Sequence, residues 1–331
     1  MKVGGQAVIE GVMMKAKDFW SVAVRDTKGV IHVKKEKLKP LPKVLKLPLL
    51  RGVVSLYEAL VLGMKALDYS ASKVYAEEGE KPLSGAAIGM TMAFSFVLGI
   101  GLFILLPLYF TKLVGMFFSA VARSSLMFNL VDGVIRVAFF LIYISIVSLW
   151  KDMRRVFEYH GAEHKVIFAY ESGLGLGMDN IRRYGTHHPR CGTSFIFIVM
   201  ILSIFVFSLI PKPWDFFMKF GSRIVLIPLI AGISYEILKL SAKMSDNPVV
   251  KLLIQPGLML QYITTKEPDD SQVEVALRAL MEVVPQVEAA QQMEPVPQTQ
   301  VVAQMEAVRQ VEAVSQVVSR MEVVPQGEIS K

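Results

Sequence analysis

The feature that most constrains the fold is the apolar segment Ala86–Phe110, which holds no charged residue over 25 positions. About 20 consecutive apolar residues are enough for a helix to cross the hydrocarbon core of a bilayer. On the surface of a soluble domain, such a segment would leave a large apolar face against water. The composition agrees, because 53% of the residues are hydrophobic and the mean hydropathy is +0.45. The sequence therefore predicts an integral membrane protein.

Three further apolar segments follow, and the last two are close to the minimum length for a span. They are Leu130–Trp150, Ser194–Ile210 and Arg223–Leu240. The alternative is a pair of buried core helices in a soluble domain, and the uncharged first segment disfavours it. We expect a mainly α-helical, polytopic membrane protein with about four spanning helices and the lipid bilayer as its first partner.

Lys and Arg residues are concentrated on one side of the predicted spans. Fifteen of them precede the first span, and seven lie in the loop 151–193 between the second and third spans. The two other loops are short and hold two and three, when Arg223 at the start of the fourth segment is counted with the loop before it. Because cytoplasmic loops are enriched in Lys and Arg, we expect both termini and the loop 151–193 in the cytoplasm.

Polar regions flank the predicted membrane domain, residues 86–265. In the N-terminal region 1–85, two stretches of alternating apolar and polar residues lie on either side of Asp26–Gly29 and predict a β-hairpin. The stretches are Trp20–Arg25 and Val30–Val33. The segment Leu49–Tyr75 has an apolar stripe at helical spacing, which predicts an amphipathic helix against the membrane or the other helices.

The C-terminal region 266–331 contains near copies of one hexapeptide. The copies are Met281–Gln286, Met293–Gln298 and Met321–Gln326. We expect one helix from Ser271 to about Val284 and then a repetitive, disordered tail. This region has a net charge of −6 within a total of +7, so the rest of the chain carries +13. Such a basic body favours contact with anionic lipid or another polyanion.

The loop after the second predicted span carries residue types that bind metals. His160 and His164 are four positions apart, so a helix places them on one face at a distance that suits one metal ion. With Glu163 they form His-x-x-Glu-His, the inverted zinc-peptidase signature, in which the histidines bind zinc and the glutamate activates water. Such enzymes take a third ligand, a glutamate, from a distant helix. Glu236 in the fourth apolar segment is a candidate by type.

A second group of ligand types lies later in the same loop. His188 and Cys191 precede the third span, and Glu171 lies between the two groups. Because the flanking spans must pack together, these side chains can converge on zinc or another divalent metal. Three other interpretations stay open. The pattern is accidental and Cys191 is a small buried residue, the zinc is structural, or Cys191 is a nucleophile with a histidine base.

Five motifs give the chain a family resemblance. They are Gly4–Met14, Leu50–Gly52, Tyr159–Lys165, His188–Phe195 and Gln255–Gly257. Over about residues 2–280 the chain resembles the YqhQ-like bacterial membrane family, domain of unknown function 1385, often labelled predicted metal-dependent enzyme. The resemblance implies a multi-pass protein of the bacterial inner (cytoplasmic) membrane. The metal residues that it implies, carried over by motif, are His160, Glu163, His164, His188 and Cys191; Glu10 and Arg51 also fall in family motifs.

These observations support hypotheses from different classes. The first is a metal-dependent hydrolase at the cytoplasmic face, with Glu163 as the catalytic base. The second is a non-catalytic membrane adaptor whose basic surface binds a polyanionic partner such as the ribosome. A transporter is the third. It would use Asp132, Arg136 and Glu236 and would require a homo-oligomer, because four spans with few polar groups offer little pathway.

Overall fold

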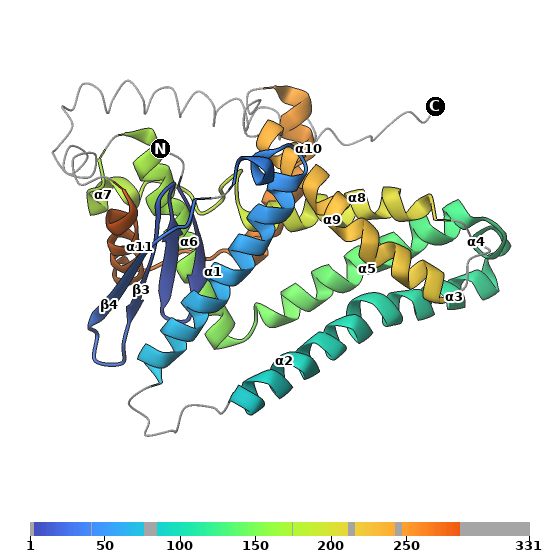
Figure 1. The fold of residues 1–331 in the computed structure, drawn as a ribbon, viewed down its shortest axis with the longest axis horizontal. Coiled ribbons are helices and arrows are strands. Elements are labelled where there is room, and N and C mark those ends of the chain that lie inside the picture. Colours follow the sequence, from blue (N-terminus) through green and yellow to red (C-terminus); the bar gives the residue numbers. More distant parts are fainter. Residues whose placement is uncertain are drawn as a thin grey trace, which may run out of the picture.

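The computed structural model describes residues 3–40, 42–75, 85–173, 175–210, 216–241 and 247–284. Within these residues the chain forms a four-stranded sheet with helices on both faces and, beside it, a group of long apolar helices (Figure 1). The tail after Val284, where we expect disorder, lies outside the described residues.

The sheet is an antiparallel meander with strand order β1-β2-β3-β4. Its strands are β1 (Gly4–Val8), β2 (Gly11–Lys15), β3 (Phe19–Arg25) and β4 (Ile31–Lys37). The hairpin predicted around Asp26 is confirmed, with Arg25 paired to Ile31. Asp26 accepts the backbone N–H groups of Lys28 and Val30, and Gly29 adopts a positive φ of 84°. Glycine suits this turn because a positive φ carries no steric penalty there.

Helices from three separate parts of the chain cover the sheet (Figure 1). They are α1 (Leu50–Val74), α6 (Lys151–Ser172) and α11 (Asp270–Val283). Side chains alternate between the faces of a strand, so Val12 and Met14 join the core with α6 and α11, whereas Met13 packs with α1 on the other face. Burial of both faces holds α6 and α11 against the N-terminal strands.

The apolar helices agree with the predicted spans. They are α2 (Gly85–Ile100), continued by the π-helical turn η2 (Gly101–Leu105) and by α3 (Leu106–Phe117), then α5 (Ser125–Val147), α8 (Gly192–Ser208) and α9 (Phe216–Ser241). Three stretches are long and apolar enough to cross a bilayer, and α8 is a shorter apolar helix of 17 residues. Those stretches are Ala93–Phe117, Ser125–Val147 and Gly221–Ser241. The expected fold class, mainly α-helical and polytopic with an N-terminal hairpin, is confirmed.

Shorter elements connect the spans to the sheet. They are η1 (Lys43–Lys46), α4 (Ser119–Arg123), α7 (Met178–Ile181) and α10 (Pro248–Thr264). Helix α10 packs against α8 and leads back to α6, where the N–H of Lys266 donates to the carbonyl of Phe157 at 2.9 Å. The chain therefore returns from the apolar helices to the sheet domain beside the histidine-bearing part of α6.

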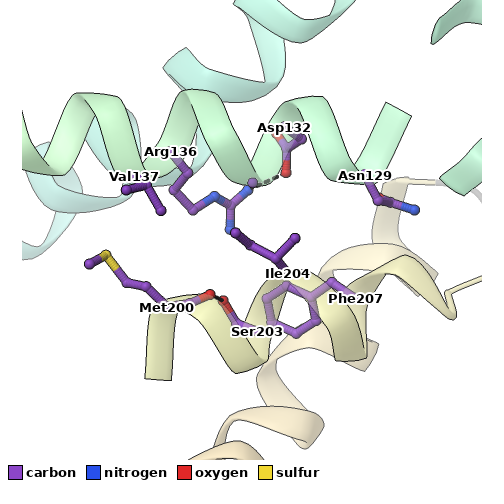
Figure 2. A pocket seen from close by; sticks show the side chains of 9 residues that line it. Asn129, Asp132, Arg136, Val137, Met200, Ser203, Ile204 and Phe207 are labelled. Atoms are coloured by element: carbon purple, nitrogen blue, oxygen red, sulfur yellow. Dashed lines mark hydrogen bonds and ion pairs between the residues drawn. The ribbon is translucent and has the colours of Figure 1, made fainter. Parts of the chain in front are cut away.

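An ion cluster around the buried Asp132 joins the apolar helices α5, α8 and α9, and Figure 2 shows its Asp132–Arg136 pair beside α8. The carboxylate of Asp132 contacts the guanidinium groups of Arg136 at 2.7 Å and Arg223 at 3.6 Å. Arg223 also lies over the ring of Phe207 at 5.3 Å from its centroid. Gly133 allows α8 to approach closely, because a Cβ there would come within 2.4 Å of Ile204. Two of the residues expected for a transport pathway, Asp132 and Arg136, thus neutralise each other.

Candidate metal centre

Helix α6 places the two motif histidines side by side. His160 and His164 are one turn apart, and their ring centroids are 4.5 Å from each other. A glycine inside a helix lowers its stability, yet Gly161 has a packing reason here. A Cβ at this position would lie 2.0 Å from the carbonyl oxygen of Lys266. Gly161 therefore lets the segment after α10 approach the helix next to His160.

Cys191 comes from the opposite side of the group, at the start of α8. It is the residue that caps this helix, and its sulfur accepts the N–H of Thr193 at 3.4 Å. The hydroxyl of Thr193 lies 3.2 Å from the same sulfur. Hydrogen-bond donors at a helix N-terminus stabilise a thiolate, which is the form of cysteine that binds metals.

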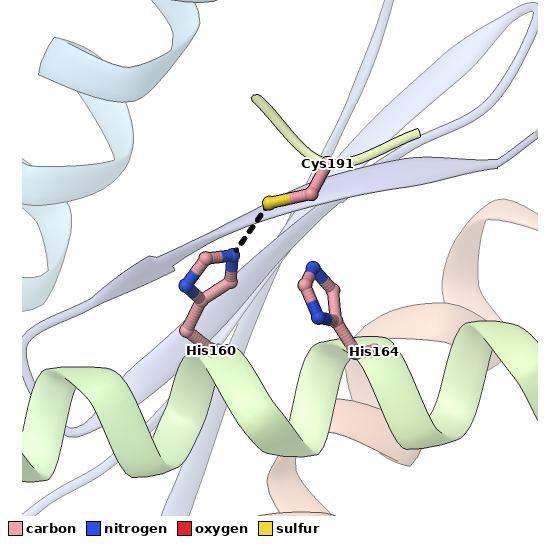
Figure 3. A group of neighbouring side chains, drawn as sticks. All are labelled: His160, His164 and Cys191. Carbon is pink, nitrogen blue, oxygen red and sulfur yellow. Dashed lines mark hydrogen bonds between the residues drawn. The ribbon is translucent and has the colours of Figure 1, made fainter. Parts of the chain in front are cut away.

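The three side chains converge (Figure 3). The ligand atoms of His160, His164 and Cys191 all lie within 4.8 Å of one another, and Nε2 of His160 is 3.2 Å from the sulfur. His164 and Cys191 are buried and His160 is partly buried. Two imidazole nitrogens and a thiolate are a donor set that suits zinc. The structure thus contains an arrangement able to hold a metal ion.

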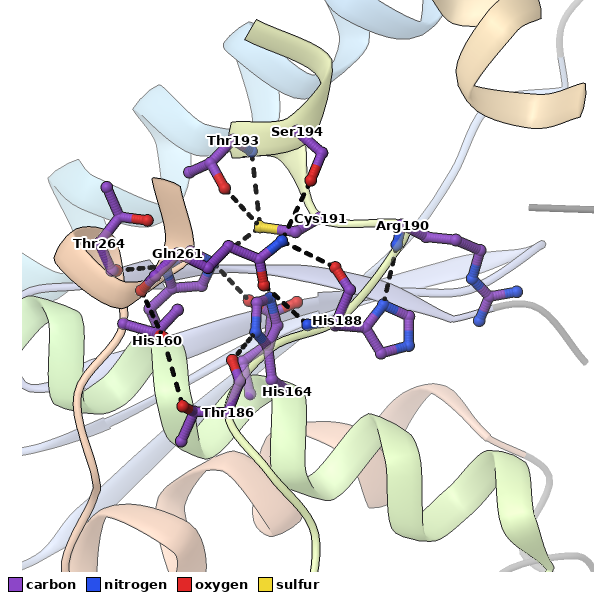
Figure 4. A network of polar contacts seen from close by, with 12 residues as sticks. His160, His164, Thr186, His188, Arg190, Cys191, Thr193, Ser194, Gln261 and Thr264 are labelled. Atoms are coloured by element: carbon purple, nitrogen blue, oxygen red, sulfur yellow. Dashed lines mark hydrogen bonds and ion pairs between the residues drawn. The ribbon is translucent and has the colours of Figure 1, made fainter. Parts of the chain in front are cut away.

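Backbone carbonyls orient both imidazoles (Figure 4). Nδ1 of His160 donates to the carbonyl of Thr264 at 2.8 Å, and Nδ1 of His164 donates to that of Thr186 at 2.5 Å. This tautomer leaves the lone pair of each Nε2 available on the side of Cys191. Burial lowers the pKa of His164 below its usual value, which favours the neutral, metal-binding form.

Glu163 lies next to the group. Its carboxylate is 3.9 Å from Nε2 of His160 and accepts the backbone N–H of Gly5 on β1. Burial raises the pKa of Glu163, because desolvation penalises the charged form. Gly5 leaves the room for this contact, since a Cβ there would lie 2.9 Å from Cγ of Glu163. The glycine-rich opening of the chain thus serves the motif on α6.

His188 and Glu171 form a neighbouring pair. The ring of His188 is 5.6 Å from that of His164 and packs on Phe168 at 4.4 Å. Its Nδ1 accepts the N–H of Arg190, and its Nε2 is 3.4 Å from Glu171. Burial lowers the pKa of His188 to about 4. His188 and Glu171 are therefore beside the three converging ligands rather than among them.

Glu236 is elsewhere. It lies on α9 and forms a two-pronged ion pair with Arg51 of α1, with Nε of Arg51 at 2.6 Å from Oε1. Glu10, a carboxylate in a family motif whose role was not assigned from the sequence, forms a similar two-pronged ion pair with Arg155 of α6. It also accepts a hydrogen bond from the hydroxyl of Tyr159 at 3.2 Å. These pairs attach α1 to α9 and the β1–β2 turn to α6.

Sequence reasoning missed Gln261 of α10. The fully buried Gln261 accepts the N–H of His188 at 2.7 Å and donates to its carbonyl at 2.9 Å and to Ser194 at 3.1 Å (Figure 4). It thereby fixes the segment that leads to Cys191. The only signal near it is the motif Gln255–Gly257 on the same helix. A Cβ at Gly257 would lie 3.1 Å from Cβ and Oγ of Ser194, which is a tight contact.

Comparison with known proteins identifies the family. A family model described as protein of unknown function, DUF1385, matches residues 47–286. The chain belongs to the DUF1385 family. It is also similar to the Uncharacterized protein YqhQ of Bacillus subtilis strain 168, with 39% identity over 296 residues that cover 85% of this chain and 92% of that protein. No solved structure matches the chain. Neither description names a metal or a reaction, so the assignment of a function rests on the residues.

Proposed function

We propose that this DUF1385 protein binds a zinc-type divalent metal through His160, His164 and Cys191 and uses it for hydrolysis at the membrane surface. One observation carries the proposal. Both histidines donate Nδ1–H to backbone carbonyls, and this leaves the two Nε2 atoms facing a single thiol within 4.8 Å. Outer partners of this kind fix the tautomer of metal-binding histidines.

The number of ligands favours catalysis over a structural role. Structural zinc sites have four protein ligands, whereas catalytic sites have three and keep one position open. Among the described residues, the group has three members. A metal held by these three residues would act as a Lewis acid toward the substrate. His188 or Glu171 would have to move to become a fourth ligand, because each is held by a contact of its own.

Glu163 is the proposed general base. It is buried within 3.9 Å of His160, and its raised pKa brings its protonation closer to neutral pH. A base works best when its pKa lies near the operating pH. The N–H of Gly5 holds the carboxylate in place. Glu163 would accept and return a proton without being a metal ligand.

Metal analysis of the purified chain tests both assignments. The wild-type protein should contain about one zinc per chain, and His164→Ala should contain none. His187→Ala is the matched control, because His187 packs on Tyr262 outside the group. Glu163→Gln should keep the metal. A metal-free wild type would remove the proposal and favour the adaptor hypothesis, and metal loss in Glu163→Gln would remove the role of base.

We also propose that the protein resides in the bacterial inner membrane with both termini in the cytoplasm. The Lys and Arg distribution supports this orientation, because the N-terminal region and residues 151–193 carry most of the positive charge outside the tail. A fluorescent reporter that matures only in the cytoplasm, fused after Lys331, should be active. An export-dependent phosphatase fused between α3 and α5 should also be active, and the reverse pattern would contradict the orientation.

A further inference from the structure

A cleft of about 610 Å³ opens beside the candidate metal centre. The first two strands, α1, Arg190 and Tyr235 of α9 form its walls. Its volume is within the range of clefts that bind small ligands. Two connections through neighbouring residues link the cleft to the candidate metal centre. Gly5 lines the cleft and donates its N–H to Glu163, and Arg190 lines the cleft directly before Cys191.

The charged groups that line this cleft are all cationic. They are Lys15, Lys17 and Arg190. Lys15 pairs with Glu58 and Arg190 pairs with Glu171, whereas Lys17 is exposed and has no ion pair within the described part of the chain. Arg and Lys side chains are the usual partners of phosphate groups. The charge in the lining that no carboxylate offsets is therefore positive, at Lys17, and it favours an anionic ligand.

Apart from Gln6 and the hydroxyl group of Tyr235, the rest of the wall carries no polar side-chain group, and part of it belongs to the candidate span in α9. Met13, Leu62 and Tyr235 line the cleft, and Tyr235 lies in the last two turns of the candidate span Gly221–Ser241. The outer side of α1, away from the lining residues Ala59 and Leu62, carries an exposed apolar row, where the sequence predicted a stripe against the membrane or the other helices. The row comprises Tyr57, Leu60, Met64 and Leu67. An apolar row on a surface helix is suited to contact with lipid, and such contact would place the cleft, on the other side of α1, at the membrane surface.

We propose that the cleft binds the anionic phosphate headgroup of a membrane lipid, whose acyl chains extend from the cleft toward the apolar helix α9. The cationic groups, the size of the cleft and its position at the end of α9 all fit this ligand. The inference rests on the proposed function, because it makes such a lipid the substrate class of the metal centre. The shared strand β1 would bring a headgroup in the cleft next to Glu163.

Gly4 offers a way to fill the cleft. A Cβ there would meet no other atom within 4 Å, so Gly4→Phe places its ring in open space without a clash at Cβ. Gly177→Phe is the matched control, since its Cβ position is also open and it does not line the cleft. Lys17→Gln removes a lining charge, and Lys39→Gln removes an exposed charge outside the lining.

Native mass spectrometry of the full chain in detergent tests the inference by titration with phosphatidylglycerol, phosphatidylcholine and glycerol phosphate. Phosphatidylglycerol should bind most tightly. Lys17→Gln should weaken this binding about fivefold, the effect of one lysine near an anionic headgroup. Gly4→Phe should abolish it, and both controls should bind as wild type does.

Three results would overturn the inference. They are unchanged binding of phosphatidylglycerol in both cleft variants, equal binding of phosphatidylcholine, and equally tight binding of glycerol phosphate, which would assign the cleft to a soluble phosphate. Zinc content, measured on the same samples, separates this inference from the proposed function. A metal-free wild type that binds phosphatidylglycerol through Lys17 removes the metal centre and retains the lipid site.

Discussion

Two clusters of polar side chains hold separate helices of the protein together. They differ in whether their lone pairs and charges already have partners within the cluster. At the sheet domain, His160 and His164 of α6 meet Cys191 of α8. Among the apolar helices, Asp132 of α5 meets Arg136 and Arg223. Both groups link distant parts of the chain, so burial and connectivity do not distinguish a functional site from a structural contact.

The chemistry of the facing atoms does distinguish them. In the histidine and cysteine group, the protons on Nδ1 point outward to carbonyls, and atoms with lone pairs point inward to each other. A cation completes such an arrangement. In the ion cluster, two guanidinium groups surround one carboxylate, so the opposite charges complete each other and the excess charge is positive. A cation would be repelled there.

The largest expected effect comes from a substitution that disrupts the histidine and cysteine group alone. Cys191→Ser replaces the thiolate with a weakly coordinating hydroxyl, so bound zinc should fall to background. In cobalt-substituted protein, the thiolate-to-cobalt charge-transfer band should disappear. Asp132→Asn should keep both the zinc and the band, because the ion cluster is not a ligand group. Equal metal loss in the two variants would mean that the two groups do not differ as argued.

The second prediction breaks the ion cluster. Asp132→Ala removes a buried carboxylate and leaves the partly buried guanidinium groups of Arg136 and Arg223 without it. Removing one partner of a buried ion pair costs about 3–5 kcal/mol. The free energy of unfolding in mixed micelles should fall by this amount while the zinc content stays unchanged. A loss below about 1 kcal/mol, the range of an exposed pair, would show that the cluster is open to water.

The fold was largely predictable because its main signals are local. The length of the uncharged segments identified the apolar helices, and the alternation of apolar and polar residues around Asp26 identified the β3–β4 hairpin. The arrangement of the sheet domain was not local. Its core joins Met14, Tyr159 and Ala276, which come from three segments separated by the apolar helices. The periodicity of one segment does not indicate which distant helix or strand will pack against it.

The candidate site was predictable in its residue types and only partly in its geometry. The four-residue spacing placed His160 and His164 on one face, and the structure adds Cys191 to them. Glu236 was a candidate because it is ionisable within an apolar segment, but its position on α9 brings it to Arg51. The orienting groups are main-chain carbonyls, which carry no sequence signal at all.

A smaller effect tests these carbonyls. Gly161→Ala puts a methyl group where the carbonyl of Lys266 lies, so the segment that carries the Thr264 carbonyl must move away from His160. Loss of an outer partner weakens metal binding by 10- to 100-fold, and about 100-fold is expected here because the backbone shifts. Zinc competition with a chromophoric chelator measures it. Gly185→Ala, which has open space, should bind zinc as wild type does.

The smallest expected effect concerns the partner of the thiol. Thr193→Val removes the hydroxyl that lies 3.2 Å from the sulfur of Cys191 but keeps the backbone N–H that donates to it. Zinc affinity should therefore fall by about tenfold, less than for Gly161→Ala, since one of the two contacts from Thr193 to the sulfur remains. Thr193→Ser restores the hydroxyl and should restore the affinity. If the Val and Ser variants bind zinc with equal affinity, the Thr193 hydroxyl does not support the thiol. Cys191 would then be positioned only by the helix terminus, as a structural residue is.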